Sequence, residues 1–509
     1  MTLIKLTPTL CLIGAVLLTG CSSSSGDDNN NPIEPFGVVD VQTEVDGAPD
    51  GNSDDSTVAP SATPGIGTDA NDTEPDDNPL VNAPAVNVPT APVAQALGEP
   101  GICTTEGINA WVDAQMRDYY IYFDQVPVVD PTEYDNPAAL LNDLRVLPDV
   151  YSSIQSQAER TALFDEGESF GYGFRFARDQ QGVMRFVNIV GGSPMEQAGV
   201  QRGDRLLAVN GVPELDLTDN LIEQFFGEVG VPTATTFTIV RDDATPFDVT
   251  VTSAVYTINT VAEVRTYDIN GSTVGYIESS RFLRTSEAEI DEAIEMMFVE
   301  NPNDVILDFR YNGGGFVYIA QKFAAQLVGR NFVGRTFQST EFNRNYEQFN
   351  RTALLEEQEI HLDLSRVIIL TTRNTASASE AIANNLSPYI DVVLIGDTTQ
   401  GKPFASVANP NCDLLLSAMD RITSNDVGET VLGGLSPTCE VADEFFHPMS
   451  SPDDALLGAA LHYLETSTCP ISLAFDPATE FRANFFRAAL DSYVDAQLPT
   501  GVFDAIELP

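Results

Sequence analysis

The residues from 22 to 100 divide this chain into a part that can form a hydrophobic core and a part that cannot. These 79 residues include 15 acidic side chains, 11 prolines and no basic side chain. A chain of this composition buries too little apolar surface to offset the entropy that it loses on ordering. We therefore expect a disordered acidic linker over residues 21–100. Because 43% of the whole chain is hydrophobic, we expect folded domains after it.

The first 20 residues resemble a bacterial lipoprotein signal peptide. Lys5 precedes an apolar run from Leu10 to Leu18, which is too short to span a bilayer. The run ends in a segment that resembles a lipobox, in which Cys21 would be lipidated, followed by Ser22 and Ser23. This resemblance implies an exported protein, anchored by lipid in the cell envelope, on the outer membrane and facing the periplasm or the exterior. With an ordinary signal peptide instead, the mature protein would be soluble.

The charge of the chain argues against nucleic acid as a partner. It contains 75 acidic and 25 basic residues, a net charge of −50, and residues 101–509 alone carry 60 acidic and 24 basic residues. Phosphate groups would be repelled by such a surface. Lysines are scarce, with only Lys5, Lys322 and Lys402 in the chain. Arginine cannot act as a base, so chemistry that needs a neutral amine has few positions available.

Cys103, Cys412, Cys439 and Cys469 remain once the leader and Cys21 are set aside. An even number in an exported chain favours two disulfides, with three pairings possible. We favour Cys412 with Cys439, which flank a hairpin-like stretch containing Gly433-Gly434, and this leaves Cys103 with Cys469. There is no CxxC pair, so a zinc site is not expected, and nothing suggests a metal or an organic cofactor.

Apolar residues recur at helical spacing between Ile102 and Phe164, including a second amphipathic stretch at 138–147. We expect a helical N-terminal domain over 101–167. The pattern then changes to short strands with one or two helices, which predicts a compact, barrel-like module over 168–257. Its strands are expected at 174–176, 185–190, 205–209, 236–240 and 247–251, with a helix near 221–226.

Two segments of this module resemble a PDZ domain. Gly171, Tyr172, Gly173 and Phe174 open a strand, and the run from Ser193 to Gly211 reads SPMEQAGVQRGDRLLAVNG. In a PDZ domain, a glycine-containing loop presents backbone N–H groups to the terminal carboxylate of a peptide, which adds to the sheet as a strand. The resemblance implies that this loop binds protein C-terminal tails. Without the downstream run, the two glycines would indicate only a turn.

Strands and helices alternate from residue 258 to 470, which predicts an α/β fold with layers around a largely parallel sheet. Residues 471–509 form a C-terminal tail. We expect strands at 274–277, 305–309, 367–370 and 392–395 and helices at 286–298, 316–327, 379–386 and 455–464.

Three loops that follow strands carry candidate chemistry. Gly313 to Gly315 open a helix with unhindered backbone N–H groups, as an oxyanion hole requires, although a turn also explains them. Ser377 and Ser379 lie among small residues at a strand-to-helix turn, where a hydroxyl can act as a nucleophile or cap the helix. Gly401 and Lys402 come close to a phosphate-loop pattern, but the proline that follows removes the hydroxyl that would bind magnesium.

A nucleophilic serine needs a base. His361, His447 and His462 are the only histidines, and none lies in a glycine-rich or strand-end loop; His462 is expected to be packed or to cap its helix. Lys402 is the better candidate, because a buried lysine without a carboxylate partner can act as a neutral base. A solvated surface lysine is the alternative.

These motifs resemble the C-terminal processing peptidases, also called tail-specific proteases, which are exported serine peptidases with a PDZ domain and a Ser-Lys catalytic pair. The matching segments are Asp308–Gly315 (DFRYNGGG), Thr375–Glu380 (TASASE) and Gly401–Pro403 (GKP). The spacing of 25 residues between serine and lysine also fits. The resemblance spans about 102–469, including the helical N-terminal domain, and is absent from the linker and the tail.

By this resemblance, Ser377 is the nucleophile, Lys402 is the base, Gly314 and Ala378 donate to the oxyanion, and Glu380 is an orienting group. One departure stands out, because relatives commonly have glutamine four residues after the lysine, where this chain has Ser406. The implied function is a lipid-anchored serine endopeptidase that acts on protein or peptide substrates with C-terminal tails. The alternatives are an inactive lipoprotein that binds C-terminal peptides and a Ser-Lys amide hydrolase acting on cell-wall peptides. The oligomeric state is not specified by the sequence.

Overall fold

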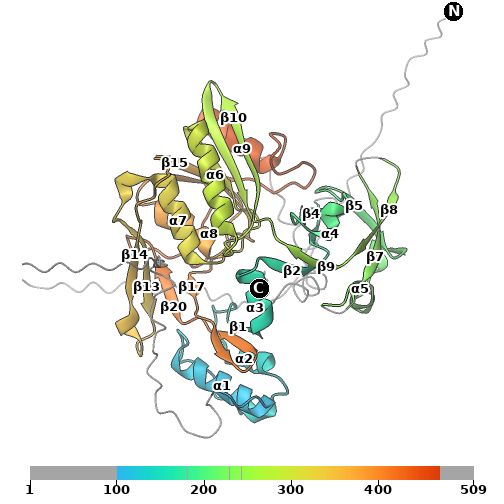
Figure 1. Ribbon diagram of the computed structural model, residues 1–509, viewed down its shortest axis with the longest axis vertical. Coiled ribbons are helices and arrows are strands. Elements are labelled where there is room, and N and C mark those ends of the chain that lie inside the picture. The colour runs from blue at the N-terminus through green and yellow to red at the C-terminus, as the bar shows by residue number, and fades with distance from the viewer. Residues whose placement is uncertain (1–99, 180–181, 228–229, 242–243, 471–509) are drawn as a thin grey trace, which may run out of the picture. The chain divides into compact units, whose positions relative to one another are not determined.

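The computed structural model describes residues 100–179, 182–227, 230–241 and 244–470 (Figure 1). They belong to one compact unit, Asp77–Pro509. The predicted signal peptide, Cys21, the acidic linker and the C-terminal tail lie outside the described residues. Within the described ranges, no helix is both long and apolar enough to cross a bilayer.

A six-stranded sheet forms the centre of the larger α/β region, with the order β10-β11-β12-β15-β16-β21. All neighbours pair in parallel except β10 and β11, which are antiparallel, so the predicted layered α/β fold with a largely parallel sheet is confirmed. Its inner strands are continuous apolar runs, as expected where helices cover both faces. The strands are β10 (Val261–Ile269), β11 (Ser272–Ser279), β12 (Asp304–Asp308), β15 (Arg366–Thr371), β16 (Asp391–Gly396) and β21 (Cys439–Glu440).

Helices pack on both faces of this sheet because successive side chains of each strand point to opposite faces. On one face, α6 (Ser286–Glu300), α7 (Val317–Val328) and α8 (Ala378–Leu386) pack on Val305 and Leu307. On the other face, α9 (Ala455–Thr466) packs on residues such as Ile306 and Ile368. Parallel strands place their carboxyl ends at one edge, and the segments that follow β12, β15 and β16 meet there.

The N-terminal region packs against a smaller sheet system that follows the central sheet in sequence. α1 (Thr105–Asp118) and α2 (Pro137–Leu144) share a core with Phe404 and Leu416. Side chains of Thr104 and Asn136 cap these two helices. The prediction that 102–164 is helical needs one correction, since Ser153–Ser156 forms β1. This strand pairs with β19 and is followed by α3 (Gln157–Phe164).

Two small sheets adjoin this region. One has the order β1-β19-β18 and the other the order β14-β13-β20-β17. Their strands were not predicted, because most are only two to four residues long. They are β13 (Thr336–Phe342), β14 (Arg351–Leu354), β17 (Phe404–Ala405), β18 (Asn409–Asn411), β19 (Leu414–Ser417) and β20 (Arg421–Ser424).

The segment from 168 to 257 forms a separate sheet with the order β3-β4-β5-β7-β8. Its core contains Phe186, Phe237 and Ile222, the last from α5 (Asp219–Phe226). The five strands agree with those expected from the sequence, and short β6 (Val212–Pro213) and α4 (Pro194–Gln197) accompany them. β2 (Glu168–Gly171) and β9 (Ala254–Thr257) pair at the two ends of the segment. The main strands are β3 (Phe174–Arg178), β4 (Met184–Ile189), β5 (Arg205–Val209), β7 (Ala234–Val240) and β8 (Phe247–Thr252).

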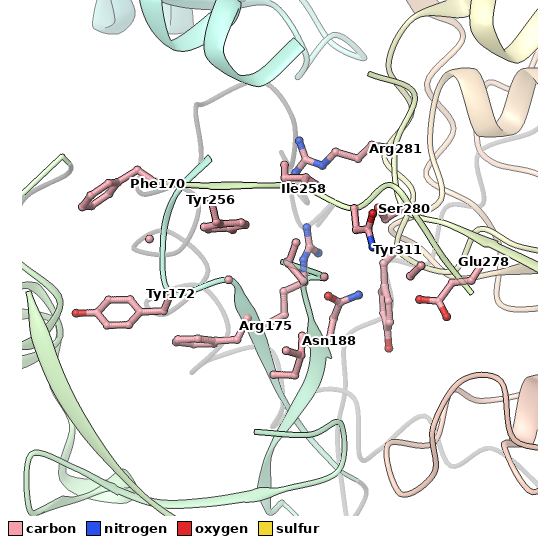
Figure 2. A pocket seen from close by; sticks show the side chains of 18 of the residues that line it. Phe170, Tyr172, Arg175, Asn188, Tyr256, Ile258, Glu278, Ser280, Arg281 and Tyr311 are labelled. Carbon is pink, nitrogen blue, oxygen red and sulfur yellow. The ribbon is translucent and has the colours of Figure 1, made fainter. Parts of the chain in front are cut away.

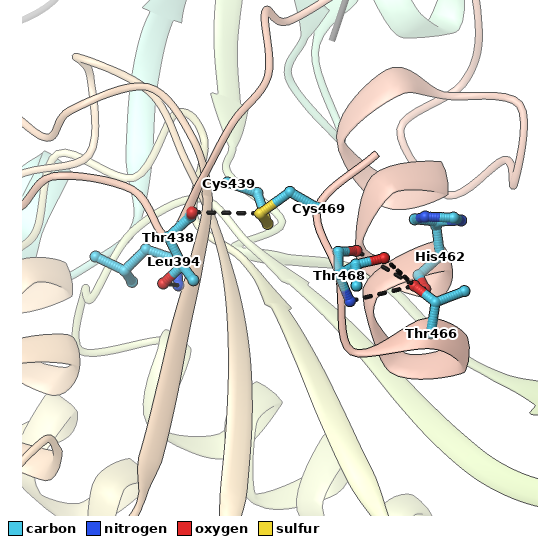
Figure 3. Close-up of a disulfide and its surroundings, with 7 residues drawn as sticks. All are labelled: Leu394, Thr438, Cys439, His462, Thr466, Thr468 and Cys469. Atoms are coloured by element: carbon cyan, nitrogen blue, oxygen red, sulfur yellow. Dashed lines mark hydrogen bonds between the residues drawn. A yellow bond between two sulfur atoms is a disulfide. The ribbon is translucent and has the colours of Figure 1, made fainter. Parts of the chain in front are cut away.

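The two disulfides join Cys103 to Cys412 and Cys439 to Cys469, so the predicted pairing was wrong. Cys412 lies at the turn between β18 and β19, which faces the start of α1, whereas Cys439 lies in β21 of the central sheet, beside the end of α9 (Figure 3). The turn of the β18–β19 hairpin therefore contains Cys412 and not Gly433-Gly434. Gly433 and Gly434 instead pack against Gly401.

Candidate active site

Ser377 lies at the turn between β15 and α8, in a backbone conformation that residues with a β-carbon rarely adopt. Its φ is +57° and its ψ is −114°, in a region where strain persists only if surrounding contacts enforce it. A strained strand-to-helix turn that exposes a serine is also how other hydrolases present a nucleophile. Ser377 is only partly buried, so its side chain remains accessible.

Ser379 is excluded as the nucleophile by its surroundings. Its side chain is fully buried, and its hydroxyl donates to the backbone oxygen of Asn312 at 2.9 Å. The alternative in which Ser379 caps the helix does not hold, because the N-cap residue of α8 is Ser377. Of the two serines, Ser377, which the family motif implies as the nucleophile, is the one with an accessible side chain.

Gly314 lies directly against the Ser377 turn. A β-carbon at position 314, where φ is +98°, would lie 2.8 Å from Ser377 Cβ and 2.9 Å from the Ala378 nitrogen, so only glycine fits there. Its own N–H donates to Asn312 Oδ1 at 2.9 Å. Gly314 and Ala378 are the two predicted oxyanion donors, and the N–H of Gly314 is therefore already hydrogen-bonded within the protein. Ala378 begins α8, where helix N–H groups have no intrahelical acceptor.

The carboxylate of Glu380 joins the serine turn to the lysine loop. Its Oε2 accepts from the Ser377 N–H at 2.7 Å and from the Lys402 N–H at 3.0 Å. Its Oε1 accepts from the Gly401 N–H at 2.7 Å and from the Thr399 hydroxyl at 2.6 Å. Burial raises the pKa of Glu380, and these hydrogen bonds act in the opposite direction. One side chain thereby fixes the backbones of both predicted catalytic residues relative to each other.

The lysine loop does not have the properties of a phosphate site. The N–H groups of Gly401 and Lys402, which a phosphate would need, donate to Glu380. The Lys402 side chain is partly buried, and its Nζ lies 5.0 Å from the centroid of the Tyr151 ring.

Neither a histidine nor a metal cluster takes the place of the lysine in this part of the chain. His361 pairs with Asp363, and His447 contributes its backbone oxygen to Arg202. His462 lies on α9 near the Cys439–Cys469 disulfide (Figure 3), where its backbone oxygen accepts from Thr466. Over the described residues, no group of three acidic, histidine or cysteine side chains is arranged to hold a metal ion.

A buried charge cluster surrounds the beginning of the DFRYNGGG segment. Arg310, with no exposed surface, binds Asp308, Asp443 and Asp454 at 2.8 to 3.0 Å. Asp443 also binds Arg202 at 2.7 Å, and Arg202 donates to the Tyr311 hydroxyl at 2.8 Å. Burial raises the pKa of Asp443, but the two guanidinium groups outweigh burial and lower it. Arg202 belongs to the segment that contains β3 to β8, so the cluster ties that segment to the loop next to Ser377.

A pocket begins at the predicted peptide-binding loop and extends to the central sheet (Figure 2). Gly171 to Phe174 form one end, and Glu278 and Tyr311 form the other, with Arg175 and Arg281 between. The Tyr172 ring itself is buried in the small sheet's core, so its backbone is the part near the pocket. Burial, followed by the charge of Asp308, raises the pKa of Glu278 to about 8.

Three contributions to the site were not assigned from the sequence. Asn312 was part of a recognised motif, but its hold on Gly314 and Ser379 was not foreseen. Thr399 binds Glu380, and Tyr151 contacts Lys402. The motif could have indicated Asn312, whereas no local pattern marks Thr399 or Tyr151.

Comparison with known proteins identifies two regions of the chain. The profile of peptidase family S41 matches residues 273–441, and that of the peptidase S41 N-terminal domain matches residues 107–153. The carboxy-terminal processing protease CtpA of Bacillus subtilis is 26% identical over 314 residues, covering 61% of this chain and 62% of the relative. A carboxyl-terminal-processing protease of Picosynechococcus is 24% identical over 267 residues, covering 51% and 61%.

A solved structure has the same fold. It comes from Bacteroides fragilis and is described as an S41 protease; its TM-score is 0.59 at 23% identity, covering 70% of this chain and 97% of that one. The two curated relatives match this chain over only about three fifths of their own length.

Proposed function

Because this chain belongs to peptidase family S41 and to its C-terminal processing peptidases, we propose that it is a serine endopeptidase with a Ser377–Lys402 dyad. The observation that carries the proposal is the shared bonding of Ser377 and Lys402 to Glu380. A nucleophile and its base must be held within reach of each other, and this carboxylate sets the separation of their backbones.

In the proposed reaction, the Ser377 hydroxyl oxygen attacks the carbonyl carbon of a peptide bond while the neutral Lys402 amine takes its proton. The negative oxygen of the tetrahedral intermediate accepts from the Ala378 N–H at the start of α8, where the helix dipole is favourable. The Gly314 N–H is a second donor if its hydrogen bond to Asn312 Oδ1 is replaced by one to this oxygen. Lys402 then protonates the leaving amine as the C–N bond breaks, which leaves an ester on Ser377.

Hydrolysis of that ester completes the cycle. The Lys402 amine, neutral again, takes a proton from water, and the hydroxide attacks the ester carbon. The Ser377 oxygen leaves with the lysine proton, and the product has a new carboxyl terminus. Apart from the protein's own groups, these steps use only water and the substrate.

We also propose that residues 168–257 are a PDZ domain that binds substrate tails. β3 is the end strand of its sheet, so a peptide can add beside it. Gly173 supports the loop, since a β-carbon there would lie 2.1 Å from Ser193 Cβ and φ is +78°. Arg175 and Arg281 line the adjoining pocket and favour a carboxylate (Figure 2).

Tail binding is tested by titrating a labelled peptide with a free C-terminal carboxylate, and its C-terminal amide, against the full-length protein. The acid should bind at least about tenfold more tightly. Gly173→Ala should abolish the preference. Gly182→Ala is a matched control, because its φ is also +78° but its surroundings are open. Equal affinity for acid and amide would contradict a PDZ role.

The proposed location is the cell envelope, with a lipid on Cys21 and the acidic residues 22–100 as a tether. The segment Leu18–Cys21 supports this proposal through its resemblance to a lipobox. Cys21→Ala should release the protein from the membrane fraction and abolish incorporation of labelled fatty acid. Continued acylation of the variant would rule out Cys21 as the anchor.

Peptidase activity is tested with the full-length protein and unfolded β-casein as substrate. Ser377→Ala and Lys402→Ala should each reduce cleavage by about 10⁴-fold or more. Lys322→Ala serves as the control, because Lys322 pairs with Glu287 and Asp291 away from the site. If all forms, wild type included, are inert yet bind C-terminal peptides, the chain is the tail-binding lipoprotein and not a peptidase.

A further inference from the structure

An aromatic side chain of the N-terminal region lies over the amine of Lys402. The Nζ atom is 5.0 Å from the centroid of the Tyr151 ring, a distance at which the ring face attracts a cation. The Tyr151 hydroxyl donates to the backbone oxygen of Gly401 at 3.5 Å. Tyr151 thus contacts both the side chain of the lysine and the backbone beside it.

Tyr151 is itself held firmly. The buried carboxylate of Asp149 accepts from the N–H groups of Tyr151, at 2.7 Å, and Ser152, at 2.9 Å. The Ser152 hydroxyl accepts in turn from the Met419 N–H at 3.0 Å. The Tyr151 ring also packs on Phe404, two residues beyond the lysine, with centroids 6.2 Å apart. The ring has little freedom to leave the lysine.

Larger connections fix the whole N-terminal region against the same part of the chain. The disulfide between Cys103 and Cys412 ties the start of α1 to the β18–β19 turn. β1, which begins two residues after Tyr151, pairs with β19. These attachments hold Tyr151 at one position relative to the loop from Gly401 to Phe404.

The ring and Glu380 act on different parts of Lys402, the ring on its side chain and Glu380 on its backbone. Glu380 fixes the backbone N–H groups of Gly401 and Lys402, but backbone bonds do not fix the four side-chain torsions of a lysine. A lysine that serves as a base must point at the hydroxyl that it deprotonates. A ring packed against the amine restricts those torsions and keeps water from one side of it.

We propose that Tyr151 is a positioning residue for Lys402, and that the N-terminal region thereby completes the active site. The proposal rests on the proposed Ser-Lys peptidase function. It assigns to Tyr151 an effect on the chemical step and not on substrate binding, since its contacts are with the lysine loop and its neighbours.

The kinetic test measures kcat and KM for the full-length protein and its variants. Tyr151→Ala should lower kcat by about 100-fold, the cost of misplacing a reacting group by about 1 Å, with little change in KM. Tyr151→Phe keeps the ring and should stay within about threefold of the wild type. Tyr151→Leu, which fills most of the space without an aromatic face, should behave like alanine and covers the case in which alanine prevents folding.

Tyr122→Ala is the control for a merely structural role. The Tyr122 ring packs on the same Phe404, with centroids 6.0 Å apart. Its loss should lower the melting temperature while kcat stays within about threefold of the wild type. If Tyr122→Ala lowers kcat as much as Tyr151→Ala, the effect reflects general packing and the proposal is overturned.

A second readout does not depend on activity. The chain has three lysines, so reductive methylation with ¹³C-formaldehyde gives few side-chain NMR signals, and Lys402→Arg identifies that of Lys402. A methyl group over an aromatic face resonates upfield. This shift should vanish in Tyr151→Leu and persist in Tyr151→Phe.

The two readouts separate the two proposals. An unchanged Lys402 signal in Tyr151→Leu, or wild-type kcat in that variant, would overturn the role of Tyr151. If the wild type cleaves nothing while the Lys402 signal depends on the ring as expected, the peptidase proposal fails and the positioning of Lys402 by Tyr151 stands.

Discussion

Two sites in this molecule stabilise buried carboxylates in different ways. Glu380 accepts from four neutral donors, three backbone N–H groups and the Thr399 hydroxyl. Asp308, Asp443 and Asp454 instead surround the guanidinium of Arg310. Glu380 fixes the positions of the Ser377 and Lys402 backbones, because hydrogen bonds are directional. The cluster around Arg310 balances charge and joins segments that are far apart in sequence.

This difference predicts how the Glu380 site and the Arg310 cluster each respond to a neutral substitution. Removing the central cation of the ion-paired cluster takes a charged partner from three buried carboxylates, which is costly for folding. Removing the charge of Glu380 leaves the fold's hydrophobic contacts intact but takes away acceptors that the Ser377 turn and the Lys402 loop share. The first change should therefore act on stability, and the second mainly on kcat.

The largest effect is expected from Arg310→Met. With the guanidinium gone, three buried carboxylates lose a partner, and the free energy of unfolding should fall by about 3–5 kcal/mol. Urea denaturation measures it. Arg284→Met is the matched control, because Arg284 pairs with Asp165 at a half-exposed position, and its loss should cost about 0–1 kcal/mol. Equal losses in the two variants would show that the buried cluster has no special structural role.

Glu380→Gln, in contrast, should lower kcat more than it lowers the stability of the fold. An amide cannot accept all four donors, so the Ser377 turn and the Lys402 loop lose their common anchor. We expect kcat to fall by about 10²- to 10³-fold, as when a preorganised donor is lost from an active site. Glu295→Gln, at an exposed position of α6, is the control and should change nothing. A variant with normal kcat would remove Glu380 from the account.

Glu278 is a third kind of buried carboxyl group, one that keeps its proton at neutral pH. Its pKa is about 8 in the folded chain, against an ordinary value of 4.5. Its protonated form stabilises the fold fully below about pH 4.5, and this contribution is lost as the pH rises through about 8. Between pH 5 and pH 9, Glu278→Gln should gain roughly 2 kcal/mol relative to the wild type, since one pKa unit corresponds to about 1.4 kcal/mol and the pocket admits some solvent.

The measurement for Glu278 is urea denaturation of both proteins across that pH range. The control is Glu295→Gln, whose difference from the wild type should not vary with pH. A Glu278→Gln difference that is constant from pH 5 to pH 9 would show that the carboxyl group is already ionised in the folded protein.

The smallest effect is expected from Ser406→Gln, which restores the residue that relatives commonly have. If the Tyr151 ring and the Glu380 hydrogen bonds already place Lys402, the added amide should change kcat by less than about threefold. Steady-state kinetics on a peptide substrate measures this. An increase of tenfold or more would mean that the lysine is poorly placed without that amide.

Much of the site could be predicted because it follows from short local patterns. Parallel strands bring the segments after β12, β15 and β16 to one edge, so the glycines, Ser377 and Lys402 were expected together. Glu380 was assigned as an orienting group, and the structure places it between both loops. The sequence could not reveal that the Gly314 N–H is taken by Asn312, because this depends on a side-chain torsion.

Other features depend on how distant parts of the chain meet. The disulfide pairing was wrong because four cysteines allow three pairings, and the correct one follows only from the paths of β18, β19 and α9. Tyr151 lies in a non-repeating segment, and nothing local indicates that it meets Lys402. Asp443 and Asp454 belong to irregular structure whose partner, Arg310, is more than a hundred residues away.

We propose above all that Ser377, activated by Lys402, is the nucleophile. The most direct test is reaction of the full-length protein with a fluorophosphonate, followed by mass spectrometry of the peptide that spans Thr375–Glu380. We expect one phosphonate on Ser377 in the wild type and none in Lys402→Ala. Label on Ser379, or equal labelling of Ser377 with and without Lys402, would contradict it.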